Sequence, residues 1–298
     1  MRDGKKAMKK KAFIYIVVAG LLWGTSGVFV HFLAPYGFSS LQMTAVRGTV
    51  SSVAIAIFAL LKDRKLFKIK PLDLLICLGV GTMLYLASAC YYSAIPMTSV
   101  STAVMLMYTA PVFVAAASVV MFGEKMSKMK IVAIVIMLVG CCLVSGVIGN
   151  FKVESIWGIL LALFAGLTYG SYNLFSKLAM RRGMNPLTVT VYGFMIMMLI
   201  GFCVTSPVGI VTTAAKAPMQ TVPLLLGLGL CTFVVPYTLY TIGLRDLPAG
   251  TASALSIVEP MSATVYSIAF LGETLTAYSV MGIILVVGSF LMLSREEE

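Results

Sequence analysis

The sequence predicts an all-α membrane protein with ten transmembrane helices, arranged as two inverted five-helix repeats. Three observations predict this fold: an apolar composition, a one-sided distribution of basic residues, and a pattern that occurs twice. The chain has 298 residues, of which 60% are hydrophobic and only 11% charged, whereas soluble domains contain roughly 25% charged residues. A globular core cannot bury so large an apolar fraction, so we expect a lipid bilayer around the chain.

The predicted spans follow from the length of the apolar runs, because each helical crossing of a bilayer needs about 20 apolar residues. The runs are continuous and lack the alternation that a β-barrel requires. The ten spans, numbered in chain order, cover residues 12–33, 40–61, 72–92, 98–122, 129–147, 156–180, 187–206, 222–243, 249–271 and 277–294.

The net charge of +11 is concentrated on one side of the predicted membrane. Nineteen of the 22 Lys and Arg residues lie before span 1, after span 10, or in and next to the loops that follow spans 2, 4, 6 and 8. By the positive-inside rule, both termini are cytoplasmic, and we expect a multi-pass protein of the cytoplasmic (inner) cell membrane. Because the positive charge is explained by topology, we expect no nucleic acid partner.

The six cysteines all lie inside predicted spans, and none forms a C-x-x-C pair. Small apolar packing residues explain them better than disulfides or metal ligands. We therefore expect no metal and no cofactor.

A short pattern is repeated along the chain. GLLWGTSG at 20–27 and GLTYGSYN at 166–173 lie 146 residues apart. Two further pairs lie 149 residues apart: Pro111 with Pro260, and Glu124 with Glu273. A repeat at this spacing indicates a duplicated unit, with residues 12–147 as the first copy and 156–294 as the second.

The second copy is expected to cross the membrane in the opposite direction, because each copy has an odd number of spans. The turn after span 4 carries three lysines, whereas the equivalent turn at 272–277 carries none. Inverted repeats of this kind recur in secondary transporters, where exchange between two similar halves gives alternating access to a central site.

Glycines four residues apart occur in both copies, at Gly20 and Gly24 and at Gly166 and Gly170. This spacing makes a groove on a helix that another helix can approach closely. The pairs predict a helix-packing seam in each half, which is either purely structural or the surface along which the halves move.

Glu259 is the candidate for charge coupling, because it lies well inside span 9, about 15 Å deep at ~1.5 Å per residue. A carboxylate at that depth is costly and is typical of a functional site, such as a proton carrier or a cation-binding group. The alternative is a structural Glu that stabilises the helix break before Pro260. Ala110 is its equivalent in the first copy, so the repeated unit does not itself need a Glu. Ser256 lies on the same predicted face of span 9.

Arg47 is another charge that lies well inside a span. It could extend to the outer headgroups, or it could act as the counter-ion of Glu259 or of a substrate carboxylate. Pro236 in span 8 frees a backbone carbonyl for a polar contact. The other substrate-binding candidates are aromatic or amide side chains within spans: Trp23, Tyr85, Tyr108, Tyr169, Asn173 and Tyr237.

The chain resembles the EamA-type, ten-helix branch of the drug/metabolite transporter superfamily over nearly its whole length. The motifs that carry the resemblance are Leu22-Trp23-Gly24-Thr25-Ser26, Arg47, Tyr108-Thr109-Ala110-Pro111-Val112-Phe113, Phe122-Gly123-Glu124, Glu259-Pro260 and Leu271-Gly272-Glu273. The resemblance implies a carrier of small metabolites, often amino acids. It also implies a central cavity lined mainly by spans 1, 3, 4, 6, 8 and 9. Tyr169-Gly170 departs from the Trp23-Gly24 of the first copy, so the two aromatic residues need not have the same role.

The favoured function is a secondary active transporter that exports a small polar or amphipathic, amino-acid-like metabolite by alternating access. Its expected partners are a small-molecule substrate, protons as one option for coupling, and the lipid bilayer, with the protein a monomer or weak dimer. An intramembrane enzyme and a non-transporting receptor or scaffold are the alternatives. An enzyme is disfavoured, since the chain has one His and lacks H-E-x-x-H and G-x-S-x-G motifs; we expect no catalytic residues.

Overall fold

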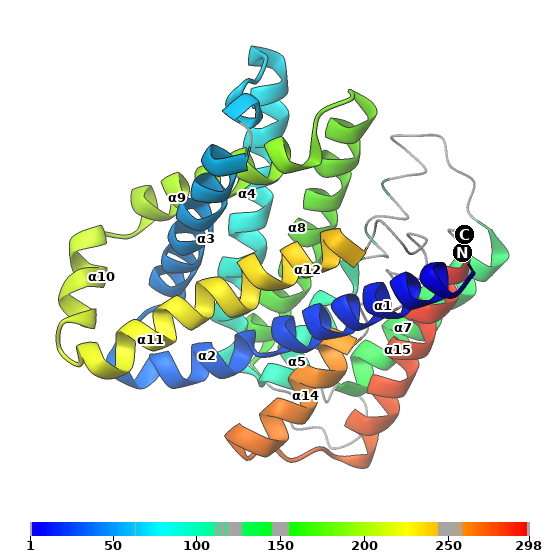
Figure 1. Cartoon of the computed structure of the whole chain (residues 1–298). Coiled ribbons are helices and arrows are strands. Elements are labelled where there is room, and N and C mark those ends of the chain that lie inside the picture. The colour runs from blue at the N-terminus through cyan, green and yellow to red at the C-terminus, as the bar shows by residue number, and fades with distance from the viewer. Residues whose placement is uncertain are drawn as a thin grey trace.

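The computed structural model describes residues 2–62, 64–110, 113, 117, 127–144, 155–243, 255 and 258–296. Every regular element in these ranges is helical (Figure 1). The longer helices are α1 (Arg2–Gly24), α3 (Ser40–Lys62), α4 (Pro71–Ala94), α7 (Lys128–Val144), α8 (Ile156–Arg181), α9 (Pro186–Val204), α11 (Pro218–Gly229), α14 (Val258–Leu271) and α15 (Ala277–Glu296). The shorter ones are α2 (Ser26–Leu33), η1 (Ala34–Tyr36), η2 (Arg64–Phe67), η3 (Ile95–Met97), α5 (Val100–Met107), α10 (Pro207–Ala214), η4 (Leu230–Val234) and α12 (Val235–Gly243).

Six helical stretches of the described chain are long and apolar enough to cross a membrane. They coincide with predicted spans 1, 2, 3, 6, 7 and 8 and cover Lys10–Tyr36, Ser40–Leu61, Pro71–Met97, Ile156–Arg181, Pro186–Val204 and Pro218–Tyr240. The chain is therefore an all-helical protein with several membrane-spanning helices.

The remaining predicted spans correspond to shorter helices. Spans 5 and 10 contain the apolar stretches Ile131–Val144 and Ala277–Ser289. Span 4 begins with α5 and span 9 ends with α14, but the other parts of these two spans lie largely outside the described residues.

Span 1 is interrupted at Thr25, where the prediction had one continuous helix. The Thr25 hydroxyl donates to the Leu22 carbonyl at 2.6 Å, and the Thr25 backbone N–H donates to the same oxygen at 3.1 Å. Hydroxyl side chains that bond the preceding turn in this way often bend helices. The bend separates α1 from α2 beside the cavity described below.

Span 8 also departs from a regular helix, because η4 between α11 and α12 is a π-helix. Pro236 lies two residues after it and lacks the N–H that a regular helix would direct to the Thr232 carbonyl. The sequence prediction also missed α10, which begins after Ser206; the Ser206 hydroxyl accepts the Gly209 N–H at 3.4 Å.

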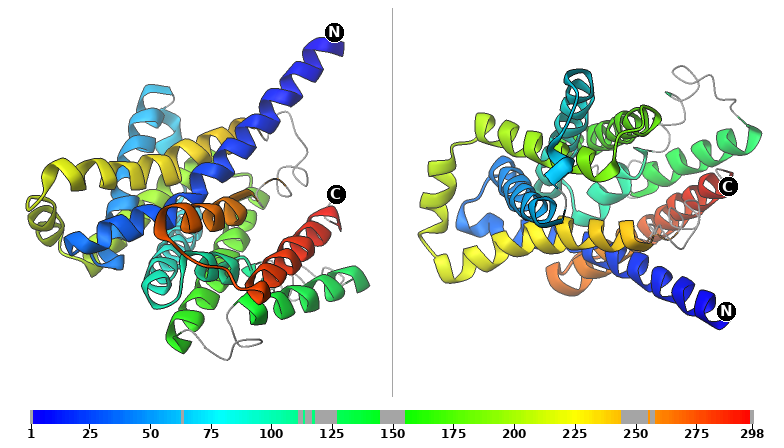
Figure 2. Two further views of the ribbon diagram at one scale, coloured as in Figure 1. Left: turned by 90° about the horizontal axis from the view of Figure 1, so that it is seen from below. Right: turned by 45° about the horizontal axis from the view of Figure 1, so that its top comes forward.

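Helices from the first and second halves of the chain pack against each other in pairs. The helix α4 packs along α8, α3 along α9, and α1 along α12 and α14. The pair α7 and α15 lies at the edge of the bundle (Figures 1 and 2). The start of α1 and the end of α15 lie on the same side of the molecule in both figures.

Large apolar side chains also cover the outside of the bundle. Leu75, Ile284 and Phe270 are each more than 60% exposed, although they lie on the apolar helices α4, α15 and α14. Exposed apolar surface on this scale is unusual in a soluble monomer. It is the surface that a bilayer would cover.

Candidate functional site

A cavity of about 50 Å³ lies where the two halves of the chain meet. Its lining contains one basic and one acidic side chain, two hydroxyls of small residues, and a wall of aromatic rings. The lining residues are Trp23, Ser26, Arg47, Leu84, Ala87, Ser88, Tyr91, Met107, Tyr169, Phe233, Tyr237 and Glu259. They belong to predicted spans 1, 3, 4, 6, 8 and 9, which the family resemblance implied, with span 2 added through Arg47.

Glu259 lies in the first turn of α14. Its Oε2 accepts the Tyr108 hydroxyl at 2.8 Å, and this bond connects the end of α5 to the start of α14. Tyr108 is only 9% exposed. The carboxylate therefore lies inside the protein between the two halves and does not face lipid.

Arg47 on α3 is buried, with 8% of its surface exposed. Its guanidinium donates to the Ser88 hydroxyl and to the Thr232 carbonyl, both at 3.1 Å. It also lies over the Phe233 ring, 4.2 Å from the centroid, and 5.5 Å from the Tyr92 centroid. The side chain therefore points into the protein and does not extend to the headgroups.

The acceptor for Arg47 on span 8 has a simple origin in the sequence. Thr232 is four residues before Pro236, so its carbonyl is the one that the proline leaves without a helical donor. Arg47 donates to this carbonyl. The freed carbonyl predicted from Pro236 is thus a contact of the buried guanidinium.

Aromatic rings form one wall of the cavity. The Trp23 ring lies 5.2 Å from Tyr237, edge to face, and 5.5 Å from Tyr240. Tyr237 also packs on Phe233 at 4.8 Å, next to Arg47. This cluster joins α1 to the end of span 8 and encloses the space between the two charges.

The repeated glycines lie at close helix contacts. A Cβ atom on Gly20 would be 2.9 Å from the Val258 Cβ, and one on Gly24 would be 2.8 Å from the Ala263 backbone N. In the other half, a Cβ on Gly166 would be 2.9 Å from the Met107 carbonyl oxygen. Gly170 is buried one turn further along α8.

Not every predicted site residue reaches the cavity. Asn173 is exposed. It lies on α8 one turn, about 5 Å, beyond Tyr169, which lines the cavity. Tyr85 is 3% exposed and belongs to the buried apolar cluster that contains Phe194 and Met197 of α9, and it does not line the cavity. Ser256 lies outside the described residues.

Several cavity residues were missed by the sequence reasoning. Ser26 belongs to the motif Leu22-Trp23-Gly24-Thr25-Ser26, which could have indicated it. Ser88 and Tyr91 are polar, but no charge or motif beside them in the sequence distinguishes them from other hydroxyl residues in spans. Ser88 and Tyr91 are three residues apart and share a helix face with Leu84. That face could be identified only once the position of Arg47 was known.

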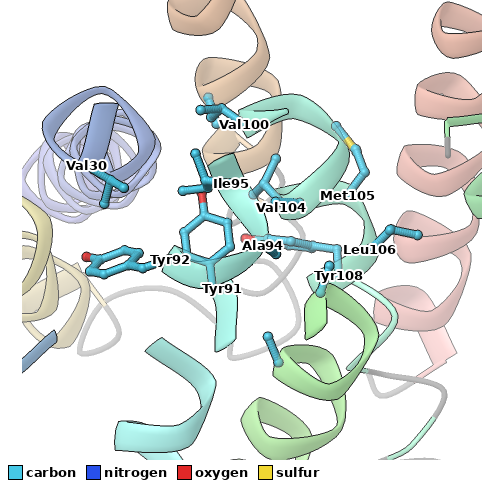
Figure 3. Packing of buried hydrophobic residues seen from close by; sticks show 14 of the residues in the cluster. Val30, Tyr91, Tyr92, Ala94, Ile95, Val100, Val104, Met105, Leu106 and Tyr108 are labelled. Atoms are coloured by element: carbon cyan, nitrogen blue, oxygen red, sulfur yellow. The ribbon is translucent and has the colours of Figure 1, made fainter. Parts of the chain in front are cut away.

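A packed apolar cluster lies next to the cavity, around the loop that joins α4 to α5. Figure 3 shows its side chains, with the rings of Tyr91 and Tyr92 among Val30, Ile95 and Val100. All five residues are less than 9% exposed. These side chains pack closely beside the cavity around that loop.

Glu273, which follows α14, connects to the start of α5 at the same end. Its carboxylate accepts the Val100 N–H at 2.7 Å and the Ser101 hydroxyl at 2.8 Å. The Ser101 and Ser267 hydroxyls are also hydrogen-bonded, at 2.8 Å. A carboxylate at a helix N-terminus is favourable there, so α5 and α14 are held together at this end.

Comparison with known proteins identifies the family to which the chain is similar. The EamA-like transporter family matches residues 10–146 and again residues 156–295. An uncharacterized transporter of Archaeoglobus fulgidus is 28% identical, with 94% of this chain and 95% of the relative covered. The uncharacterized transporter YwfM of Bacillus subtilis is 27% identical, with 94% and 93% covered.

A relative with a named substrate is the threonine/homoserine exporter RhtA of Salmonella typhimurium. It is 28% identical, with 74% of this chain and 71% of the relative covered. A crystal structure superposes with a TM-score of 0.65 at 16% identity over 97% of this chain and 99% of that one, which shows the fold alone. These names are consistent with a membrane transporter for a small molecule rather than an enzyme. The chain belongs to the EamA-like transporter family, as the resemblance in its motifs predicted.

Proposed function

We propose that the protein is a secondary carrier that exports a small, amino-acid-like metabolite across the cytoplasmic membrane by alternating access. The observation that carries this proposal is the central cavity, which holds both Arg47 and Glu259 at the junction of the two halves. A non-transporting scaffold has no need for two opposite charges at this depth, where each is costly.

Pairing of the halves supports two inverted repeats, 12–147 and 156–294. The contact of Gly20 with Val258 has a counterpart in the contact of Gly166 with Thr109. Both residues of the second contact are the repeat equivalents of those in the first, since Gly20 corresponds to Gly166 and Val258 to Thr109. Two related seams are what an approximate two-fold axis in the membrane plane would produce.

The distribution of charge supports cytoplasmic termini in the inner membrane. A hollow of about 440 Å³ between the α3–α4 and α8–α9 connections is lined by Lys68, Lys70 and Arg182. Arg182 also bonds Asp73 at 3.0 Å, so the two predicted cytoplasmic loops are joined. Single cysteines at Lys68 and Lys216, in a background without other cysteines, test the orientation: an impermeant thiol reagent added outside should label only position 216.

The size of the cavity supports a requirement for conformational change. A space of about 50 Å³ holds a few waters, but it is too small for an amino acid. The Glu273 contacts and the apolar cluster around Val100 close the end that the charge pattern assigns to the outside. We infer that the described conformation is closed toward the outside, and that release outward requires α5 and α14 to separate.

Protons are the proposed coupling ions, with Glu259 as their carrier, and the working unit is a monomer or weak dimer. The substrate class follows from the cavity's two charges and from the name of the threonine/homoserine exporter among the relatives. Export is favoured because this relative is named as an exporter.

Flux through liposomes tests the function directly. Purified protein is first screened by thermal shift against amino acids, polyamines, nucleosides and sugars. Each hit is then tested for counterflow in proteoliposomes, with empty liposomes as the control. Counterflow of at least one amino acid is the expected result, and the proposal fails if no metabolite in the screen is transported.

A further inference from the structure

We propose that the cavity selects zwitterionic α-amino acids by binding both of their charges, the carboxylate on Arg47 and the ammonium on Glu259. This inference rests on the proposed transport function and adds to it the orientation of the substrate. It also decides between the two roles that the sequence left open for Arg47, counter-ion of Glu259 or ligand of a substrate carboxylate.

Arg47 has more N–H donors than its contacts with the described residues use. A guanidinium carries five N–H donors in a fixed fork, and in the described part of the chain this one bonds two neutral acceptors, Ser88 and the Thr232 carbonyl. Its Nε is buried and has no hydrogen-bond partner among the described residues. An unpaired buried donor is costly, and a carboxylate binds an arginine fork through two parallel bonds.

The guanidinium is also held in place without a substrate. It is anchored from α4 by Ser88 and from η4 by Thr232, and it lies between the Phe233 and Tyr92 rings. Because these contacts come from uncharged groups, they fix the orientation of Arg47 and leave its charge uncompensated by a carboxylate. Such a group is ready to bind an anion without rearrangement.

Glu259 provides the opposite charge on the same cavity. Tyr108 holds its Oε2 atom, which leaves Oε1 for another donor. The rings of Trp23, Tyr169 and Tyr237 line the space beside it, and an ammonium is stabilised both by a carboxylate and by aromatic faces.

The charge balance of the cavity selects the ligand class. One positive and one negative side chain match one negative and one positive group on a zwitterion. A simple anion would neutralise the charge of Arg47 and leave Glu259 without a counter-charge, and a simple cation would do the reverse; either mismatch is costly in a desolvated site. The aromatic rings of Trp23, Tyr169 and Tyr237 line the space in which the ligand would lie.

The test compares binding of matched ligands that differ by one charge. L-threonine, L-threoninamide and N-acetyl-L-threonine are the first set, and the other common amino acids with their amides and N-acetyl forms follow. The intact protein should bind the zwitterion at least about tenfold more tightly than either derivative, since each derivative leaves one buried charge unpaired.

Two variants assign each preference to one side chain. Arg47→Gln should abolish the preference for L-threonine over L-threoninamide and retain the preference over N-acetyl-L-threonine. Glu259→Gln should give the reverse pattern. Because Arg47→Gln removes contacts among three helices, Pro236→Ala is the second test: it restores the N–H that competes for the Thr232 carbonyl. It should weaken L-threonine binding severalfold and leave L-threoninamide binding nearly unchanged.

The outcomes separate this inference from the proposed function. Counterflow of amino acids and of their amides at equal rates overturns the inference and leaves the transport function intact. Transport of other metabolites with no binding of any amino acid also overturns it. Loss of both preferences in a single variant that melts normally would show that the two charges act as one ion pair, and would contradict the assignment.

Discussion

The first turn of α14 and the equivalent stretch at the end of α5 differ in one respect that matters for function. Both lie against a glycine of the other half: Val258 against Gly20, and Thr109 against Gly166. The first turn of α14 carries Glu259, whereas the equivalent residue after α5 is Ala110, which is 3% exposed.

This difference separates packing from chemistry. Close helix contact occurs in both copies, so it belongs to the repeated unit. The carboxylate occurs in one copy only, so the fold does not need it. The two regions meet through the bond from Tyr108 to Glu259, which makes the first copy the support for the charge of the second.

Placing a carboxylate at Ala110, the position in the first copy that is equivalent to Glu259, should have the largest effect on stability. Ala110→Glu places a carboxylate at a buried position, and an unpaired charge within a membrane costs about 3 kcal/mol or more. We expect a strongly lowered melting temperature or no folded protein. Ala110→Gln has the same shape without the charge and is the control. Equal melting of the two variants would show that size, not charge, limits this position.

Adding a methyl group at the close glycine contacts should have the second largest effect on stability. Gly24→Ala and Gly166→Ala each place a Cβ within 3.0 Å of backbone atoms of a facing helix, and such overpacking costs about 1–3 kcal/mol. Gly288 in α15 has open space at the Cβ position, so Gly288→Ala is the matched control. Thermal unfolding should show both seams destabilised and the control unchanged or slightly more stable. If only one seam responds, the two halves are not packed equivalently.

Loss of the hydrogen bond between Tyr108 and Glu259 should have a smaller effect on stability. Tyr108→Phe removes the hydroxyl that donates to Glu259, a loss of about 1.5–3 kcal/mol for a bond to a charged group. Melting should fall by a few degrees, and substrate affinity should change more than for Tyr85→Phe. The Tyr85 hydroxyl has no hydrogen-bond partner among the described residues, so that variant is the control. Identical behaviour of the two variants would remove Tyr108 from the site.

Much of this architecture could be predicted from the sequence because lipid imposes simple rules. Apolar runs predicted the helices, and the six stretches of the described chain that are long and apolar enough to cross a membrane coincide with predicted spans. Arg47 and Glu259 were recognisable as candidates because charges within spans are rare. Pro236 indicated a free carbonyl, and Arg47 donates to the one that it frees.

The prediction and the structure differ where the position of a residue along a helix decides whether its side chain lines the cavity. Asn173 and Tyr169 are one turn apart, but only Tyr169 lines the cavity, because the depth of a polar residue cannot be obtained from periodicity. Tyr85 packs toward α9 because its face is set by helix pairing across the repeats. The break at Thr25 depends on a local hydroxyl bond that composition does not reveal.

The most direct test of the account is amino-acid counterflow in proteoliposomes containing Glu259→Gln, with melting measured on the same preparation. The account predicts normal folding, because the first copy has Ala110 at this place, together with counterflow reduced at least about tenfold by the loss of a buried charge interaction. Glu259→Asp should retain part of the activity, since the charge remains and only its reach is shortened. A Gln variant that folds normally and transports at the rate of the unmodified protein would contradict the account and would leave Glu259 with only a structural role in the helix break.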